Sequence, residues 1–243
     1  ASGSSGNCIF VGTDHTGVLI DAGISGKKVV AGLQSIDRRP EEIDAIFITH
    51  EHSDHIRGLG VLARKYGIPV YSTAGTRRAM LGQKTLGKVD ESLFFELKAD
   101  ERFCIRDLCV EPFRVSHDAA EPVAYRFFQG DKSVAVATDL GYYDEYIVDH
   151  LKDLDAVLVE SNHDTHMLQV GAYPYYLKQL LGEILNDKIK AVMLGHLSRE
   201  NNYEALAMAT VCAEITMGEN PFKAEDFQIQ IAGREEPSPL IAI

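Results

Sequence analysis

One run of six residues, H-E-H-S-D-H at positions 50–55, constrains this chain more than any other stretch. An apolar, strand-like segment ends directly before the run, and a helix with apolar periodicity is predicted to begin near its end. Imidazole nitrogens and carboxylate oxygens are the ligands that zinc and similar divalent ions prefer. His50 and His52, two residues apart in an extended loop, can reach one ion together, whereas Asp54 and His55 can hold a second. The run therefore predicts a metal site rather than a polar surface loop that holds three histidines by chance.

Four further polar residues close strand-like runs elsewhere in the chain. Asp21 ends the strand in G-V-L-I-D-A-G, and R-V-S-H-D, V-A-T-D-L-G and M-L-G-H-L-S contain His117, Asp139 and His196. With the run at 50–55, these five matches occur in the order found in the metallo-β-lactamase-fold hydrolases, whose H-x-H-x-D-H signature is present in full. The chain resembles that superfamily over nearly its whole length.

Two segments resemble one branch of the superfamily, the YycJ (WalJ) type. One is the opening S-G-S-S-G-N followed by a strand, and the other is L-G-H-L-S-R-E-N-N at 194–202. The branch resemblance implies a short strand ahead of the opening loop, which the chain, beginning at Ala1, does not include. It also implies 5′-to-3′ exonuclease activity in DNA processing or repair.

The chain is expected to form a single metallo-β-lactamase-fold domain over residues 1–243, because no linker divides it and its apolar content suffices for a large core. Strands alternate with helices in both halves, which fits the α+β, four-layer αββα sandwich that the resemblance implies, with the site at the edge between the sheets. The predicted strands are 8–12, 18–22, 45–49, 69–72, several between 93 and 138 with breaks at 99–100, 107 and 130–132, 156–160, 191–194 and 227–232. The predicted helices are 25–36, 56–66, 74–81, 143–151, 173–186 and 202–214.

Carried over residue by residue, the resemblance implies two divalent ions, zinc or manganese with iron also possible. The implied ligands are His50, His52 and His117 for one ion, Asp54, His55 and His196 for the other, and Asp139 as a bridge. Asp54 is also expected to orient or deprotonate the attacking nucleophile. Asp21 is expected to fix the ligand loop through hydrogen bonds, and direct binding to an ion is its alternative. Taken alone, His117 resembles an ordinary strand-end histidine and Asp139 a helix N-cap, and only their place in the matched order favours the metal.

Substrate contacts are predicted in two loops. Asn162 and His163 follow a predicted strand where a site-facing loop should lie, and His166 is the weaker choice there. Ser198 and Arg199 join a hydroxyl and a guanidinium to a helix start, which is a combination suited to phosphate. A plain helix cap by Ser198 or Asn201 is the alternative.

The formal net charge of −12 counts against a passive nucleic-acid-binding module, because Lys and Arg supply most non-specific affinity for phosphate. It counts less against an enzyme whose bound ions add positive charge locally.

The four cysteines form no C-x-x-C pair and are expected to be reduced core thiols, with metal binding as the alternative. No apolar run approaches the roughly 20 residues of a membrane helix, and no signal peptide opens the chain. A cytoplasmic location without membrane contact is expected.

The predicted function is a metal-dependent hydrolase of phosphodiesters, a DNA exonuclease that acts on DNA ends. A small-molecule ester, thioester or lactone hydrolase on the same ions is the alternative, since the chain has no basic arm to hold a long polymer. A flavodiiron-type oxidoreductase is disfavoured, because the resemblance would then predict a carboxylate in place of His52. A non-catalytic interaction domain is weaker still, because the ligand set is complete. Protein partners and oligomeric state stay open.

Overall fold

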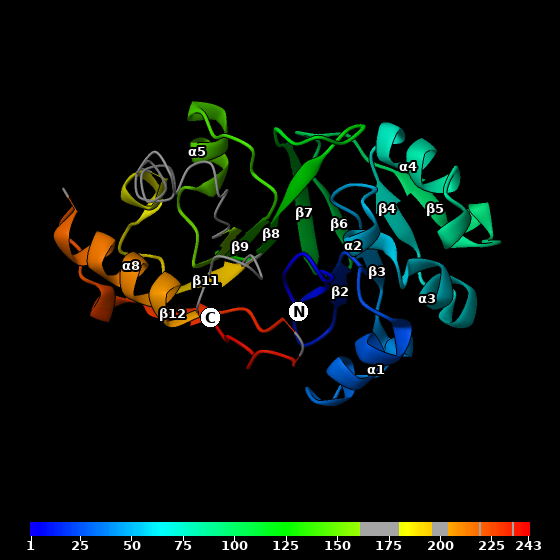
Figure 1. The fold of residues 1–243 in the computed structure, drawn as a ribbon, viewed down its shortest axis with the longest axis horizontal. Coiled ribbons are helices and arrows are strands. Elements are labelled where there is room, and N and C mark those ends of the chain that lie inside the picture. Colours follow the sequence, from blue (N-terminus) through cyan, green and yellow to red (C-terminus); the bar gives the residue numbers. More distant parts are fainter. Residues whose placement is uncertain (161–179, 196–203, 219, 235) are drawn as a thin grey trace.

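Two β-sheets lie face to face at the centre of the molecule (Figure 1). The structure is a computed structural model that describes residues 1–160, 180–195, 204–218, 220–234 and 236–243. In these ranges the first sheet has five strands in the order β1-β2-β3-β4-β5. They span Ile9–Gly12, Gly17–Ile20, Ala45–Phe47, Val70–Ser72 and Phe94–Glu96.

The second sheet has seven strands in the described residues, in the order β12-β11-β10-β9-β8-β7-β6. From β6 to β12 they span Phe103–Ile105, Leu108–Arg114, Val123–Gln129, Lys132–Ala137, Ala156–Glu160, Ala191–Gly195 and Gln228–Ile231. Strands β2 to β5 run parallel in the first sheet, and β9 to β12 run parallel in the second. Ligand sites of such sheets lie outside the carboxyl ends of the parallel strands, where Asp21 follows β2, the run at 50–55 follows β3 and Asp139 follows β9.

In the described residues, three buried apolar clusters lie between four layers, which are the two sheets and the helices outside each sheet. Because side chains alternate across a strand, Val18 and Ile20 of β2 face the second sheet while Leu19 faces the helices outside the first. Helices α1 (Gly26–Gln34), α3 (Leu59–Tyr66) and α4 (Ala74–Leu81) cover the first sheet (Figure 1). Helices α5 (Glu145–Leu151) and α8 (Glu204–Met217) cover the second, together with a helical turn at 180–184. The predicted αββα sandwich is confirmed.

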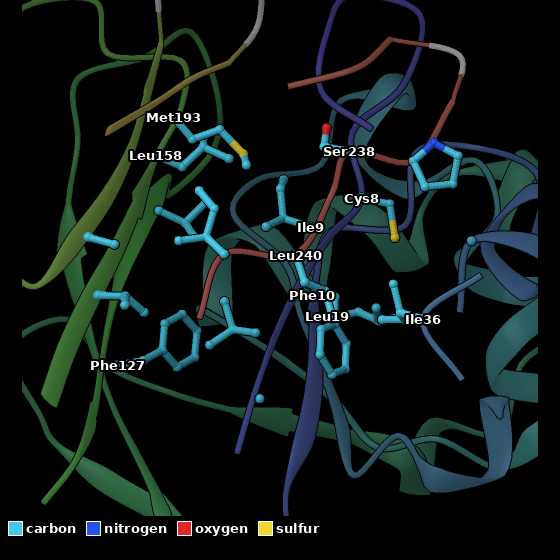
Figure 2. Close-up of a pocket in the computed structure, with 18 of the residues that line it drawn as sticks. Cys8, Ile9, Phe10, Leu19, Ile36, Phe127, Leu158, Met193, Ser238 and Leu240 are labelled. Carbon is cyan, nitrogen blue, oxygen red and sulfur yellow. The ribbon is translucent and has the colours of Figure 1, made fainter. Parts of the chain in front are cut away.

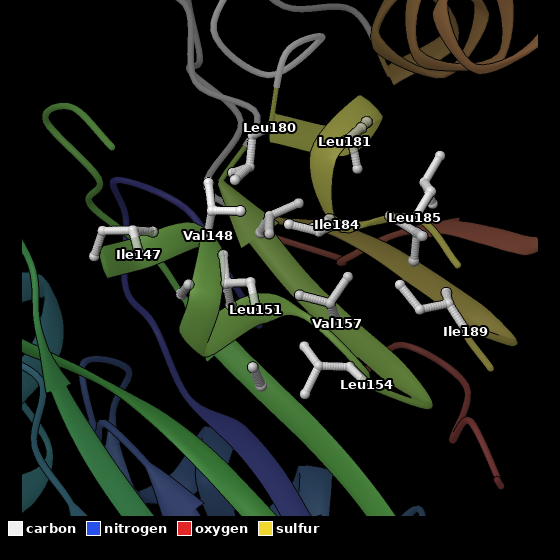
Figure 3. Packing of buried hydrophobic residues seen from close by; sticks show 14 of the residues in the cluster. Ile147, Val148, Leu151, Leu154, Val157, Leu180, Leu181, Ile184, Leu185 and Ile189 are labelled. Carbon is white, nitrogen blue, oxygen red and sulfur yellow. The ribbon is translucent and has the colours of Figure 1, made fainter. Parts of the chain in front are cut away.

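The outer face of β10 shows how this layering is packed (Figure 3). Val157 of β10 belongs to the same buried cluster as Val148 and Leu151 of α5 and Leu181 of the helical turn at 180–184. None of the helices in the described ranges is long and apolar enough to cross a bilayer.

The helix predicted at 56–66 begins earlier than expected and is broken in two. A short helix α2 covers Ser53–Ile56, and α3 begins at Leu59. Gly58 donates its backbone N–H to Ala22 O at 2.7 Å, and a Cβ at Gly58 would lie 2.1 Å from Ile24 O. The chain therefore bends where it presses against the loop after β2. The long strand section has one further break, at 115–122. Residues 173–179 of the helix predicted at 173–186 lie outside the described residues.

The prediction of four reduced core thiols is wrong for one pair. Strands β6 and β7 form an antiparallel hairpin whose register sets Cys104 opposite Cys109, and a disulfide joins them. Cys104 is exposed and Cys109 half-buried, so neither belongs to the core. Cys8 and Cys212 are free.

Candidate metal centre

Two aspartates turn the chain at the ends of strands. Asp21 follows β2 with φ of 61°, and Asp139 follows β9 with φ of 57°. Few residues other than glycine adopt this left-handed conformation, and aspartate is among those that tolerate it best. Both side chains are buried, at 0% and 8% exposure. Residues in this sparsely populated backbone conformation often cluster at functional sites, and here two of them lie at the same edge of the two sheets.

Asp21 organises the loop that carries the first histidine. Its carboxylate accepts the backbone N–H of Thr49 at 2.9 Å and the Thr49 hydroxyl at 2.9 Å. The Thr49 hydroxyl also lies 3.0 Å from Nδ1 of His50. With Nδ1 occupied, the His50 ring turns Nε2 toward the other histidines. The structure places Asp21 under the ligand loop, in hydrogen bonds to the residues that carry the imidazoles.

The imidazole of His55 is held in the same way. Its Nδ1 lies 2.7 Å from Asp21 Oδ2, and the ring is fully buried. Its Nε2 lies 3.5 Å from Oδ2 of Asp54 and 3.5 Å from Oδ2 of Asp139. One imidazole nitrogen and two carboxylate oxygens thus converge on one small volume, which is a donor set that suits zinc or manganese.

Three histidines form a second group beside it. His52 Nδ1 lies 3.1 Å from His50 Nε2 and 3.3 Å from His117 Nε2. Among the described residues, two triads have donor atoms close enough to share an ion, namely His50, His52 and His117, and His50, His55 and Asp139. The first sheet supplies His50, His52 and His55, and the loops after β7 and β9 of the second sheet supply His117 and Asp139.

Asp139 lies between the two groups. Its Oδ1 is 3.9 Å from His117 Nε2, whereas its Oδ2 is 3.5 Å from His55 Nε2. Each oxygen of one carboxylate therefore faces a different set of nitrogens, as expected of a bridging ligand between two ions.

The pKa values of the two buried imidazoles, His50 and His55, are shifted in opposite directions. Burial, followed by the charges of neighbouring imidazoles, lowers the pKa of His50 far below its usual range, so His50 is neutral and its nitrogen is available to an ion. Burial alone would also lower the pKa of His55. The charge and hydrogen bond of Asp21, with contributions from Asp54 and Asp139, instead raise the pKa of His55 to about 10.

Metal uptake is therefore expected to release a proton at neutral pH. An ion that binds His55 Nε2 displaces the proton that this ring carries below pH about 10, so zinc affinity should rise with pH, by up to about tenfold per unit. Calorimetry in buffers of different ionisation enthalpy measures the proton, and chelator competition from pH 6.5 to 8.5 measures the affinity. Asp21→Asn should flatten this dependence, and affinity independent of pH in the unsubstituted protein would contradict it.

The raised pKa of His55 also makes the stability of the metal-free protein depend on pH, in the direction opposite to metal affinity. A pKa raised from 6.5 to about 10 stabilises the fold fully below pH about 6.5, and this contribution is lost as the pH rises through about 10. Metal-free protein should thus become less stable across the range in which metal binding becomes tighter.

The structure brings together most of the predicted ligands, and five predicted site residues lie outside the part of the chain that it describes. Those brought together are His50, His52, Asp54, His55, His117 and Asp139, with Asp21 beneath them. Those outside it are Asn162, His163, His196, Ser198 and Arg199. Sequence reasoning did not single out Thr49 or Asn7, which both contact ligand histidines. A threonine that ends an otherwise apolar strand was the available signal for Thr49.

A cavity of about 1040 Å³ lies away from this centre (Figure 2). Apolar side chains of β1, the inner face of the second sheet and the C-terminal segment line it, among them Phe10, Phe127, Leu158 and Leu240. None of the predicted metal ligands that the structure describes lines it. A large apolar pocket is the usual first choice for a ligand site, but here the chemistry lies elsewhere.

Comparison with known proteins decides the family. Residues 16–217 match the family model described as the beta-lactamase superfamily domain. This chain belongs to the metallo-β-lactamase superfamily. Among solved structures, the metallo-beta-lactamase fold protein YhfI from Bacillus subtilis matches this superfamily member with a TM-score of 0.68 at 16% identity, over 94% of this chain and 89% of that one. At that identity the match supports the fold alone.

Two curated relatives confirm the resemblance to the YycJ (WalJ) branch of the metallo-β-lactamase superfamily. Exodeoxyribonuclease WalJ from Streptococcus pneumoniae is 41% identical over 261 residues, which cover 100% of this chain and 96% of that protein. Exodeoxyribonuclease YycJ from Bacillus anthracis is 38% identical over 227 residues, which cover 87% of this chain and 85% of that protein. The first match covers the whole chain and therefore includes the strands and loops that carry the His and Asp groups.

Proposed function

We propose that this chain, as one domain over residues 1–243, is a metal-dependent exodeoxyribonuclease that removes nucleotides from DNA ends in the 5′-to-3′ direction. The full-length similarity to two exodeoxyribonucleases supports the substrate class. The observation that carries the chemistry is the carboxylate of Asp139, whose two oxygens face His117 in one ligand group and His55 in the other. The proposed setting is DNA processing or repair in the cytoplasm.

The proposed ligands are the seven residues named from the sequence, with His196 completing the second group. Two divalent ions held there, zinc or manganese, would make water a stronger nucleophile at neutral pH and stabilise charge on the attacking and leaving oxygens of a phosphodiester. Asp54 is 23% exposed while its Oδ2 reaches the buried His55, so its carboxylate can accept a proton from the nucleophile at the mouth of the site. Asp21 and Thr49 keep the imidazoles aimed during the reaction.

The remaining proposed contacts hold the substrate. Ser198 and Arg199, at a predicted helix start beside His196, bind the terminal phosphate, and Asn162 with His163 meets the substrate or leaving group from the neighbouring loop. An acidic protein that holds DNA through one terminal phosphate favours attack near an end over attack within a long duplex.

The test compares linear and closed DNA. Metal-loaded protein should release short products from a linear 5′-phosphorylated duplex and leave closed circular DNA largely intact, as measured with end-labelled substrates in zinc or manganese. Protein that leaves linear DNA intact but hydrolyses a thioester or lactone at an enzymatic rate would replace this proposal with the small-molecule alternative.

Arg199→Ala should weaken use of 5′-phosphorylated DNA by about 1–3 kcal/mol in kcat/KM, the cost of a lost charge-assisted hydrogen bond. The defect should be much smaller with 5′-hydroxyl DNA, because that substrate lacks the phosphate that Arg199 binds. Arg39→Ala is the matched control. Arg39 is exposed, pairs with Glu42 in its own turn and lies before the start of β3, whereas the metal ligands follow the end of that strand. Equal losses with both substrates would contradict the assignment.

A further inference from the structure

The opening loop, residues 2–7, is buried against the metal centre. Ser2 is 1% exposed and Asn7 is 0% exposed, although both side chains are polar. Polar groups buried to this degree are kept where they make specific hydrogen bonds. The contacts of Asn7 show which part of the centre the loop serves.

The side chain of Asn7 contacts a ligand histidine. Its Oδ1 accepts the backbone N–H of Gly3 at 2.8 Å and the hydroxyl of Ser2 at 3.2 Å. These two donors fix the amide orientation, so Nδ2 is the atom that faces His55 Nε2, at 3.0 Å. Asn7 thus reaches the ring nitrogen of His55 that faces the proposed ion, while Asp21 holds the other ring nitrogen.

The backbone of Asn7 holds the helix that carries Asp54 and His55. Its N–H donates to Asp54 O at 2.7 Å, and its carbonyl accepts the N–H of Gly23 at 2.7 Å. The three backbones pack so closely that a Cβ at Gly23 would lie 1.5 Å from Asp54 O and 2.8 Å from Asn7 N. The position of Asp54 and His55 is therefore set by the opening loop as well as by their own helix.

The other end of the loop touches the second sheet. Ser2 donates its backbone N–H to Gly233 O at 3.1 Å, just beyond β12. A Cβ at Gly195 would lie 2.8 Å from Ser2 Oγ, and Gly195 ends β11 directly before His196. One short loop thus contacts both the helix that carries Asp54 and His55 and the strand that leads to His196.

We propose that Asn7 is a positioning residue that keeps the opening loop against Asp54 and His55, two of the ligands assigned to the second ion. The inference rests on the two-ion centre proposed above. Outer contacts that orient metal ligands typically change metal affinity by about 10–100-fold. Nδ2 faces the ring nitrogen that a proton or an ion occupies, so the orienting effect comes from the other contacts of Asn7. Oδ1 fixes the opening loop through Ser2 and Gly3, and the backbone N–H holds that loop against Asp54 O, so Asn7 favours binding.

The test measures zinc affinity at each site without substrate. Asn7→Ala should weaken the second ion by about 10–100-fold and leave the first ion within about twofold, in titrations against a chromophoric chelator. A His52→Ala protein, which lacks a ligand of the first ion, identifies the isotherm that belongs to the second. Ser4→Ala is the matched control, because Ser4 is the exposed residue of the same loop.

Two more variants separate positioning from folding. Asn7→Asp keeps an acceptor for Gly3 and Ser2 and should restore the affinity of the second ion. Ser2→Ala removes one of the two donors to Asn7 Oδ1 and should weaken the second ion by about two- to tenfold. Unchanged affinities in Asn7→Ala, or equal weakening of both ions, would overturn the proposal. Because no DNA is used, a failure of the nuclease proposal leaves this result standing.

Discussion

Asp139→Ala is expected to impair both metal sites at once and to reduce DNA cleavage by at least about 10²–10³-fold, the cost of removing one electrostatic stabiliser of a transition state. The reason is geometric, because one oxygen of Asp139 faces His117 and the other faces His55. Loss of His52 or His117 removes a donor from one group, whereas this loss reaches both. Elemental analysis of purified protein and a cleavage assay at saturating zinc or manganese measure the two effects.

The control for this variant is a surface aspartate. Asp131→Ala alters an exposed carboxylate in the turn between β8 and β9, at the opposite end of β9 from Asp139, and should retain both ions and full activity. An Asp139→Ala protein that still binds two ions with unchanged affinity would remove Asp139 from the centre. Loss of only one ion would refute the bridging role.

Removal of metal by EDTA is expected to abolish DNA cleavage and to lower the melting temperature by about 10–20 °C. An ion present at about 100 times its Kd stabilises the folded state by about 2.7 kcal/mol, so two ions contribute about 5 kcal/mol. Each kcal/mol shifts the melting temperature of a domain of this size by about 2–4 °C. The stabilisation is large because the ions join side chains of both sheets and offset the repulsion of the Asp54 and Asp139 carboxylates.

Calorimetry at fixed pH, with and without chelator, measures this shift, and activity should return when zinc or manganese is added back. Asp139→Ala provides the comparison, because a protein that has lost both ions gains nothing from added zinc. A melting temperature unchanged by EDTA, in protein shown to have lost its metal, would mean that the ions do not couple the two sheets.

Much of the architecture could be predicted, because short local patterns in the sequence indicate it. The H-E-H-S-D-H run, short strands and turn residues predicted the αββα layers and the family, and α4 and β10 begin and end at the predicted residues. The break between α2 and α3 could not be predicted, since it comes from contact of Gly58 with the loop after β2. The Cys104–Cys109 bond likewise depends on the register of a hairpin, which composition does not give.

The residues of the candidate centre likewise differ in whether the sequence alone could reveal them. His50, His52 and His55 could be found from spacing because they lie within one short run. Asn7 could not, because an asparagine in a Ser/Gly-rich stretch looks like an ordinary turn residue, and only the fold brings it beside His55. The roles of Asn162, His163, His196, Ser198 and Arg199 stay predictions of the sequence.

The division of the ligands between two sheets has a consequence for synthesis of the protein. The ribosome releases the run at 50–55 about 90 residues before Asp139, which at roughly 5–20 residues per second is an interval of several seconds. During that time the nascent chain presents a histidine-rich loop without the carboxylate that lies between the two groups. If the proposed ligand set holds two ions, both can be captured only after β9 has emerged and the second sheet has docked on the first. We therefore expect metal loading to be a late event, so that a chain with both ions has already folded both sheets.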